Sequence, residues 1–425
     1  MKIRGLRWFI VSLVALATVI NYIDRNALAI MWPEISKDIG ASKDDYANLV
    51  VVFTMFYALG QSAFGKIFDV IGTRMGFVAS IIIWSASIAL HATARSIGAF
   101  ALLRSTLAFS EAGNWPGAVK ANAEWFPPRE RAFAQGIFNS GASLGAIVSL
   151  PLIAWLFTLF GWKATFAAVG VLGALWIIPW LVIYKAGPAI HPWLTNKERI
   201  HILGAGTEIE SAVPVGQLYA PTMKQLLSHK ESWAIILSRL FLDPIWWLFV
   251  SWLPIYLSES FGFDVQQIGA FGWVPYVGAM LGALSGGWFA GILIRSGCSV
   301  GFARKAMVIF GGLLMLPALL LTGRASDPLT AVLLIAVILF GFQVAIGNIQ
   351  TLPSDYFHGS SVGLMAGMSG TAAVLSVLVV TKLVPVMTSV SFAPVFVMSS
   401  LFVPLSIASL IFLGGRVEKV TSKSE

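Results

Sequence analysis

Long apolar stretches recur along the whole chain, and they constrain the fold more than any other feature of the sequence. A helix needs roughly 20 mostly apolar residues to cross the hydrocarbon core of a bilayer. Because lipid offers no hydrogen-bond partners to the backbone, only helices and closed barrels cross it, and long runs without strict alternation favour helices. The composition agrees: 57% of the 425 residues are hydrophobic and 11% are charged, too little charge for a water-exposed surface.

The apolar stretches predict an all-α membrane protein with twelve transmembrane helices, arranged as two pseudo-symmetric six-helix bundles. Basic residues precede the first stretch, as in a signal peptide, but the stretch is too long and lacks a cleavage site of small residues. We therefore interpret it as the first transmembrane helix. The predicted spans are 8–32, 46–68, 75–94, 98–120, 132–157, 163–185, 232–257, 266–293, 305–323, 328–351, 362–385 and 391–414.

A polar, proline-containing break divides the spans six and six. It predicts an N-terminal bundle at 1–186, a linker loop at 187–231, and a C-terminal bundle with a short tail at 232–425. An even number of spans puts both termini on one side of the membrane, and the bias of basic residues toward the inside places that side in the cytoplasm. The terminal basic residues are Lys2, Arg4, Arg7, Arg416, Lys419 and Lys423.

The net charge of +8 raises the question of a nucleic-acid partner, because basic chains can bind polyanions. Most Lys and Arg fall in segments assigned to the cytoplasm, so the charge reports membrane topology and no nucleic-acid partner is expected. The lipid bilayer is the expected surroundings. The single cysteine, Cys298, excludes an intrachain disulfide.

The two halves share a short internal repeat. Residues 124–126 are followed by Gly136, and residues 355–357 are followed by Gly367; each copy is an acid, an aromatic residue and a Phe, with a Gly twelve residues after the acid. Each copy lies between the fourth and fifth predicted spans of its half. Parallel repeats of this kind predict a substrate site near the midplane and alternating access by rocking of the halves.

The loop between the second and third spans contains Gly65, Asp69, Gly72 and Arg74. The glycines allow a tight turn, and Asp69 can bridge neighbouring helix ends; the alternative is a solvated turn. In this position the pattern resembles the hallmark loop of the major facilitator superfamily, and a degenerate copy occupies 286–291 in the second half. The resemblance covers nearly the whole chain and implies the fold of that superfamily, with this loop as a gating latch on the cytoplasmic side.

Segments at 21–25, 111–120, 124–127 and 243–247 resemble the anion:cation symporter family and, within it, the bacterial hexuronate transporters. Relatives in that family carry aldonates such as galactonate and aldarates such as glucarate. Galactonate-type members tend to have an Asn in the eleventh helix, where this chain has Gly-Met-Ser-Gly at 367–370, which favours the hexuronate branch. The resemblance implies proton-coupled symport of a hexuronate such as glucuronate or galacturonate by a monomer in the bacterial inner membrane. An aldonate, an aldarate or another organic anion is the alternative.

Three acidic residues fall inside predicted helices: Asp24, Glu111 and Asp243. A charge at the bilayer centre costs about 2.5–3.5 kcal/mol on insertion scales, so such residues usually face a cavity or a partner. Arg104 and Glu111 lie on one helix face, about 10 Å apart along the axis. We predict that Arg104 binds the substrate carboxylate and that Glu111 holds a proton. The alternative is that both only pair with other helices.

The resemblance adds three roles: Asp24 resembles the family's second protonation site, and Arg25 and Tyr57 resemble substrate or gating contacts. Arg239 and Asp243 are four residues apart and fit either an internal ion pair or a coupling role. Weaker candidates for substrate contact are polar or aromatic residues in predicted helices, with helix packing or membrane anchoring as the alternative for several of them. They are Gln61, Asn114, Asn139, Trp247, Trp273, Gln343, Asn348 and Ser369.

Other classes of protein fit the sequence poorly. The five His are scattered without an H-x-x-H or cysteine pattern, so neither a metal site nor an enzyme is expected. The sequence contains no phosphate-binding loop of the G-x-x-x-x-G-K-[ST] form, which argues against an ATP-driven pump. The uneven charge of the two halves does not suggest a channel ring. No cofactor is expected, with protons as the coupling ion.

Overall fold

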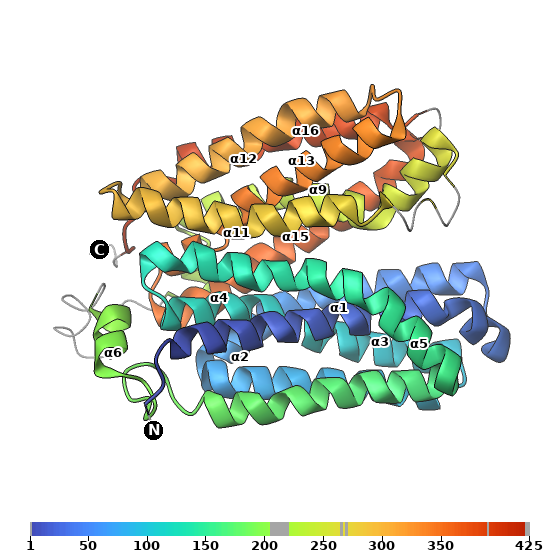
Figure 1. Ribbon diagram of the computed structural model, residues 1–425, viewed down its shortest axis with the longest axis horizontal. Helices are drawn as coiled ribbons and strands as arrows, with labels where there is room; N and C mark the ends of the chain where they lie inside the picture. The colour runs from blue at the N-terminus through green and yellow to red at the C-terminus, as the bar shows by residue number, and fades with distance from the viewer. Residues whose placement is uncertain (1, 205–220, 264–266, 268–270, 389–390, 421–425) are drawn as a thin grey trace. The chain divides into compact units, whose positions relative to one another are not determined.

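The computed structural model describes residues 2–204, 221–263, 267, 271–388 and 391–420. Within these ranges the chain is almost wholly helical, and one isolated bridge between Ile3 and Leu194 is the sole strand-like feature. Figure 1 follows the helices along the chain from blue to red. They are α1 (Leu6–Ile39), α2 (Lys43–Leu90), α3 (Ile97–Glu111), α4 (Asn114–Trp125), α5 (Pro128–Ile183), α6 (Asn196–Leu203), α8 (Met223–Leu226), α9 (Lys230–Phe261), α11 (Val274–Arg295), α12 (Val300–Thr322), α13 (Pro328–Ile349), α14 (Leu352–Tyr356), α15 (Gly359–Met387) and α16 (Ala393–Gly414), with a 3-10 turn at His91–Thr93.

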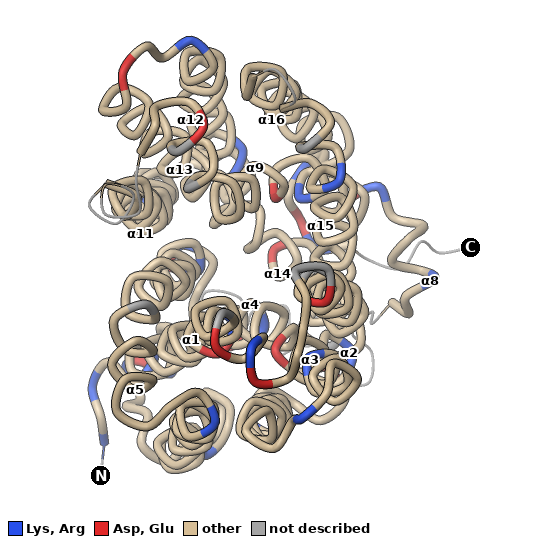
Figure 2. Tube along the Cα trace, turned by 90° about the vertical axis from the view of Figure 1, so that its right-hand side faces the viewer, with Lys and Arg blue, Asp and Glu red and all other residues tan. Residues whose placement is uncertain are grey.

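Nine segments of the described chain are long and apolar enough to cross a membrane. The helices α2 and α5 each contain a reversal and therefore supply two passes, and α3 together with α4 supplies another. The predicted all-α membrane fold with twelve passes is thereby confirmed. Figure 2 views the helices nearly end-on and shows that charged positions are sparse along them, as expected for helices that face lipid.

The helix α2 contains the second and third predicted spans, and the chain reverses inside it at Gly72. The backbone of Gly72 has φ 79° and ψ 163°, which interrupts the helical geometry. The rings of Phe68 and Phe77 lie 5.1 Å apart, although nine residues of straight helix would separate them by about 13 Å. The predicted break at this position is therefore a tight hairpin between two antiparallel arms.

The helix α5 reverses in the same way at Gly161, which has φ 71° and ψ 172°. Its second arm runs back along α1. Trp162, at the start of this arm, donates to Asp38 at 2.8 Å, and Trp176, further along, donates to the backbone carbonyl of Leu13 at 2.8 Å. Rising numbers in α5 thus meet falling numbers in α1, so the two segments are antiparallel.

The chain forms two compact units, each of which has most of its residue contacts within itself. Unit 1 is Met1–Pro127, Gly141–Ala220 and Gly359–Thr371, and unit 2 is Pro128–Ser140, Pro221–His358 and Ala372–Glu425. The helices α5 and α15 therefore each contribute residues to both units. The predicted division into two bundles and a linker stays a prediction, and residues 205–220 of that linker lie outside the described residues.

The internal repeat has the same local geometry in both copies. Glu124 and Asp355 are each the penultimate residue of a short helix, α4 or α14, that follows a longer helix after a brief break. Phe126 and Phe357 end these helices in an extended conformation, with φ −127° and −115°. The next long helix begins two residues later in each copy. The repeat is therefore structural and reaches beyond the sequence triplet.

The first part of the predicted linker packs against the start of α1. Glu198 of α6 accepts hydrogen bonds from the amides of Gly5 and Leu6 at 2.9 and 3.3 Å, and from the guanidinium of Arg7 at 2.8 Å. The carboxylate satisfies amides that an α-helix leaves free at its N-terminus. In the same segment, burial lowers the pKa of His191 and favours its neutral ring.

Two predicted spans differ from the observed helices. The span 98–120 is two helices: Ala112 and Gly113 keep right-handed helical φ and ψ, but the amide of Gly113 bonds to the carbonyl of Ser110, three residues back, which interrupts the α-helical hydrogen-bond pattern. The span 266–293 corresponds to α11, which begins at Val274 with Pro275 in its first turn, where the missing amide is tolerated. Most of the residues that precede α11 in that span lie outside the described ranges.

We expect Gly72→Ala to lower the melting temperature of the purified protein, because the backbone conformation of Gly72 costs a residue with a side chain about 1–3 kcal/mol. No described atom beyond its chain neighbours lies within 4 Å of the position of a Cβ there, so the penalty comes from the backbone alone. Gly98→Ala is the matched control, since Gly98 is equally open but lies in α3, where Ala favours the helix. Equal melting temperatures of the two variants would contradict the hairpin.

Candidate functional site

Four charged side chains lie in the helical interior of unit 1. Asp24 and Arg25 come from α1, and Arg104 and Glu111 come from α3. Asp24 and Glu111 are fully buried, and Arg104 is 4% exposed. Taking a charge out of water costs several kcal/mol unless it is paired, so each of these groups requires a partner, a proton or a ligand.

Glu111 pairs across helices with Arg25. The Nη2 atom of Arg25 lies 3.5 Å from Oε2 of Glu111 and donates to the side-chain oxygen of Asn21 at 3.2 Å. The amide nitrogen of Asn21 in turn lies 3.5 Å from the backbone carbonyl of Glu111. One alternative from the sequence was that Arg104 and Glu111 only pair with other helices. Glu111 does pair with α1 in this way, although the contact is long for an ion pair.

Arg104 is held by an aromatic ring. Its ζ carbon lies 4.7 Å from the ring centroid of Phe53, within cation–π range. Its Nε and Nη1 atoms have no hydrogen-bond partner among the described residues, and neither carboxylate oxygen of Asp24 has one. Buried donors and acceptors in proteins are nearly always satisfied, so these groups are suited to a ligand or a proton.

Three further predicted substrate residues belong to the same unit. The ring centroid of Tyr57 lies 4.8 Å from the ζ carbon of Arg25. Asn114 donates to the hydroxyl of Thr18 at 2.9 Å, which ties α4 to α1. Gln61 is buried, and its Oε1 atom accepts no hydrogen bond from the described part of the chain. Their contact with a substrate stays a prediction.

Three of the polar residues predicted to contact substrate belong to unit 2, and the hydrogen bonds that they make there involve other residues of unit 2. Asn139, near the start of α5, donates to Gln350 at 3.0 Å. Asn348 donates to a carbonyl of its own helix at 2.9 Å, whereas its Oδ1 atom has no partner in the described part of the chain. Gln343 is buried, and its Oε1 atom has no partner among the residues that the structure describes. A substrate role for these three residues is untested.

The charged and aromatic candidates in α9 and just before α11 have distinct surroundings. Arg239 lies 2.7 Å from Asp243, so the internal ion pair predicted as one of two alternatives is present. Trp247 is partly buried, and Trp273 precedes α11 with half of its surface exposed. Stacking of these indoles on a sugar stays a prediction.

The predicted gating loop carries a buried ion pair. Lys120 lies 2.6 Å from Oδ1 of Asp69, and the other oxygen of Asp69 accepts the amide of Leu364 at 2.7 Å. Gly65 allows this approach, because a Cβ there would collide with the carbonyl of Gly363. Asp69 therefore joins α2 to α4 and to the first turns of α15, all within unit 1, and the loop is more than a solvated turn.

The remaining residues of that loop and of α15 have structural contacts. Gly72 forms the hairpin, and Arg74 donates to the backbone carbonyl of Leu181 at 3.2 Å. Ser369, predicted as a substrate contact, donates to the carbonyl of Ala366 at 2.8 Å within its own helix. The gating role of the loop stays a prediction.

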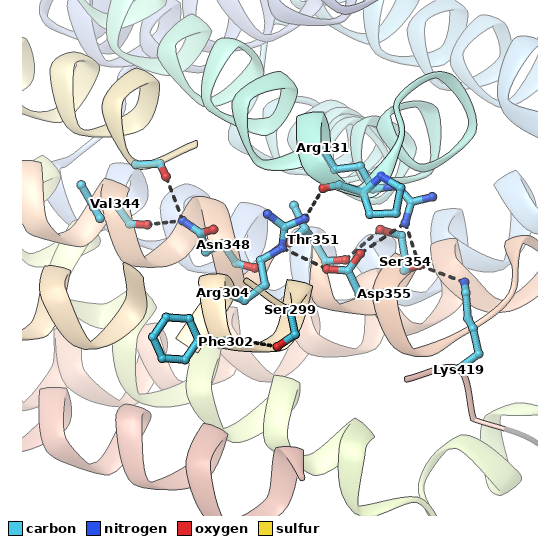
Figure 3. Close-up of polar contacts among 12 residues, drawn as sticks. Arg131, Ser299, Phe302, Arg304, Val344, Asn348, Thr351, Ser354, Asp355 and Lys419 are labelled. Carbon is cyan, nitrogen blue, oxygen red and sulfur yellow. Dashed lines mark hydrogen bonds and ion pairs between the residues drawn. The ribbon is translucent and has the colours of Figure 1, made fainter. Parts of the chain in front are cut away.

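A buried carboxylate that sequence reasoning did not assign to a site organises part of unit 2 (Figure 3). Asp355 lies 3.2 Å from Arg131 of α5 and 3.0 Å from the fully buried Arg304 of α12. Beside it, Lys419 donates to the carbonyl of Ser354 at 3.0 Å. The two arginines are 224 and 51 positions away in sequence, so local spacing could not reveal the cluster. The internal repeat was the only signal that marked Asp355.

The described residues contain no group of three or more His, Cys, Asp or Glu placed to hold a metal ion. The charged groups of unit 1 can instead bind an anion through arginine and carry protons on carboxyls. Binding an anion and exchanging protons are both noncovalent steps, of the kind that transport of an anion together with protons calls for.

Comparison with known proteins identifies the class. The sequence model of the Major Facilitator Superfamily matches residues 14–381. The chain belongs to this superfamily: it is a multi-pass membrane transporter of small molecules and not an enzyme.

Characterised relatives are similar over most of their length. The hexuronate transporter of Escherichia coli K12 is 31% identical over 94% of this chain and 92% of its own. The galacturonate transporter of Dickeya chrysanthemi is 33% identical over 74% of this chain and 90% of its own. A D-galactonate transporter of Escherichia coli O6:H1 is 28% identical over 97% of both chains.

Solved structures confirm the fold. The human organic anion transporter MFSD10 superposes with a TM-score of 0.71 at 18% identity, over 96% of this chain and all of its own. The superfamily transporter FucP, solved in the outward conformation, superposes with a TM-score of 0.69 at 13% identity, over 97% of this chain and all of its own.

We expect Asp355→Asn to lower the melting temperature strongly, because it removes the carboxylate shared by Arg131 and the buried Arg304, and breaking a buried pair costs about 3–5 kcal/mol. Glu34→Gln is the matched control: it breaks the pair with Lys37, whose side chains are 49% and 71% exposed and whose contribution is about 0–1 kcal/mol. If Asp355→Asn melted at the same temperature as Glu34→Gln, the cluster would have no stabilising role.

Proposed function

We propose that this chain is a proton-coupled symporter that takes up a sugar-acid anion, in particular a hexuronate such as glucuronate or galacturonate. Relatives named as hexuronate and galacturonate transporters, 31% and 33% identical, support the substrate class. Relatives named for D-galactonate and for galactarate and D-glucarate are 28% identical and define the alternative substrates, an aldonate or an aldarate. The chain would act as a monomer in the bacterial inner membrane, with both termini in the cytoplasm.

The main support for the proposal is that Arg104 is buried with hydrogen-bond donors that are unpaired within the described chain. Its guanidinium is buried, its ζ carbon lies over the ring of Phe53, and two of its nitrogen atoms find no acceptor among the described residues. A carboxylate matches the planar, forked donors of arginine, and a charge-assisted bond is strongest where water is excluded. A sugar acid supplies this group, whereas a neutral sugar does not.

The charge of the site couples the anion to protons. Asp24, Arg25, Arg104 and Glu111 sum to zero net charge when both carboxyls are ionised. Each proton that binds makes the group more positive and favours an anion, and by linkage the anion favours the proton. Protonation of Glu111 would also weaken its long contact with Arg25 and release that guanidinium toward the substrate. Protons would be the coupling ion, without another cofactor.

Transport requires that these ligands bias two conformations of the chain. In transporters built from parallel repeats, one half rocks against the other and exposes the site to alternate sides of the membrane. A ligand shifts this equilibrium only by its difference in affinity for the two conformations. Protonation of Asp24 and Glu111 on loading provides such a difference, because an uncharged carboxyl costs less to seal from water than a carboxylate does.

We expect Glu111→Gln to abolish accumulation of a hexuronate driven by a proton gradient in proteoliposomes while exchange of labelled for unlabelled substrate continues. The amide keeps the shape of the protonated carboxyl and cannot release a proton, so coupling is lost and binding is retained. The measurement is the ratio of gradient-driven accumulation to counterflow.

Glu124→Gln is the matched control, because Glu124 is a partly buried glutamate of the same unit that accepts hydrogen bonds from neutral hydroxyls, at 2.7 Å from Thr73 and 2.6 Å from Tyr184. Its ratio of accumulation to counterflow is expected to match that of the unmodified chain. Unchanged gradient-driven accumulation by Glu111→Gln would rule out Glu111 as the coupling group.

A further inference from the structure

We infer that Phe53 is a positioning residue for substrate: its ring lies against the guanidinium of Arg104 without accepting a hydrogen bond, and the Nε and Nη1 donors stay available for a carboxylate. This inference rests on the proposed function, and the sequence alone gives Phe53 no role. Phe53 lies in the first arm of α2 and is 7% exposed, so the contact is sheltered from water.

The geometry is that of a shared aromatic platform. The Phe53 centroid lies 4.7 Å from the ζ carbon of Arg104 and 5.5 Å from that of Arg25. Tyr57, one turn further along α2, stacks on Phe53 at 5.9 Å with an interplanar angle of 17° and lies 4.8 Å from Arg25. Two like charges thus share one stacked pair of rings, and the negative faces of the rings offset part of the cost of burying both.

An aromatic ring can orient an arginine side chain without occupying its N–H donors, whereas a carboxylate partner occupies them. An acidic partner occupies the N–H edge, so a substrate carboxylate would have to displace it. A ring contacts the face, and the N–H groups stay available. The unsatisfied Nε and Nη1 atoms of Arg104 show this arrangement, while Arg25 shows the other, with Asn21 and Glu111 at its Nη2 atom.

This difference assigns separate tasks to the two arginines. Arg104 is preorganised for the anion, because its side chain is oriented before the substrate arrives and little rotamer freedom is lost on binding. Arg25 is engaged with a protonatable carboxyl and becomes available as Glu111 takes up a proton. Phe53 contacts both and fixes the frame in which the carboxylate is bound.

The test replaces the ring and follows substrate affinity separately from turnover. Phe53→Leu keeps an apolar side chain and removes the aromatic face, so KM for hexuronate uptake by proteoliposomes is expected to rise several-fold, up to about 30-fold. The maximal rate of counterflow at saturating substrate is expected to stay within twofold of the unmodified chain. Phe53→Tyr, which keeps the ring face, is expected to restore KM.

Phe64→Leu is the matched control, because Phe64 is a buried phenylalanine of the same helix that packs on Phe109 with ring centroids 5.6 Å apart. It is expected to change stability and leave KM unaltered. If Phe53→Leu does not yield folded protein, Phe53→Met supplies a flexible apolar side chain for the same measurement.

An unchanged KM in Phe53→Leu or Phe53→Met, or a KM in Phe53→Tyr as high as in Phe53→Leu, would overturn the inference while leaving the proposed function intact. A similar rise of KM in Phe64→Leu would also overturn it, because the effect would then be one of packing. Failure of the unmodified chain to take up any uronate, aldonate or aldarate would overturn both.

Discussion

A buried arginine whose donors are left free is the feature on which the rest of the site depends. Arg104 is 4% exposed, and two of its nitrogen atoms have no hydrogen-bond partner in the described chain. The protein tolerates this charge because the guanidinium lies over the ring of Phe53 and because carboxyls of α1 and α3 share the interior of the unit. The low dielectric that makes the unpaired guanidinium costly also strengthens its attraction for a carboxylate, so burial and affinity have one physical cause.

The two copies of the internal repeat show how one local geometry serves different surroundings. Glu124 accepts hydrogen bonds from two hydroxyls, those of Thr73 and Tyr184. Asp355, at the equivalent position, binds two guanidiniums instead, those of Arg131 and Arg304. Both acids lie at the end of a short helix just before a long one, where they anchor neighbouring segments. The groups suited to ligand binding lie elsewhere, within the long helices. A charge there costs free energy unless a partner or ligand compensates it, so such charges usually mark functional sites.

Local features of the fold and site could be predicted from sequence, and long-range pairings could not. Apolar runs predicted the twelve passes, and Asp24, Arg104 and Glu111 stood out because charges are rare in such runs. The partner of Glu111 is 86 positions away, and no helical periodicity encodes that distance. Phe53 was missed for a different reason: a phenylalanine in an apolar helix has no distinguishing pattern until its cationic neighbours are placed around it.

The most direct test of the account is equilibrium binding of galacturonate and of the neutral hexose galactose to the purified chain and to Arg104→Gln. We predict that the unmodified chain binds the acid and discriminates strongly against the neutral sugar, because only the acid supplies the carboxylate that the guanidinium lacks. In Arg104→Gln this preference should disappear. Equal binding of acid and neutral sugar by the unmodified chain, or a preference that survives in Arg104→Gln, would contradict the account.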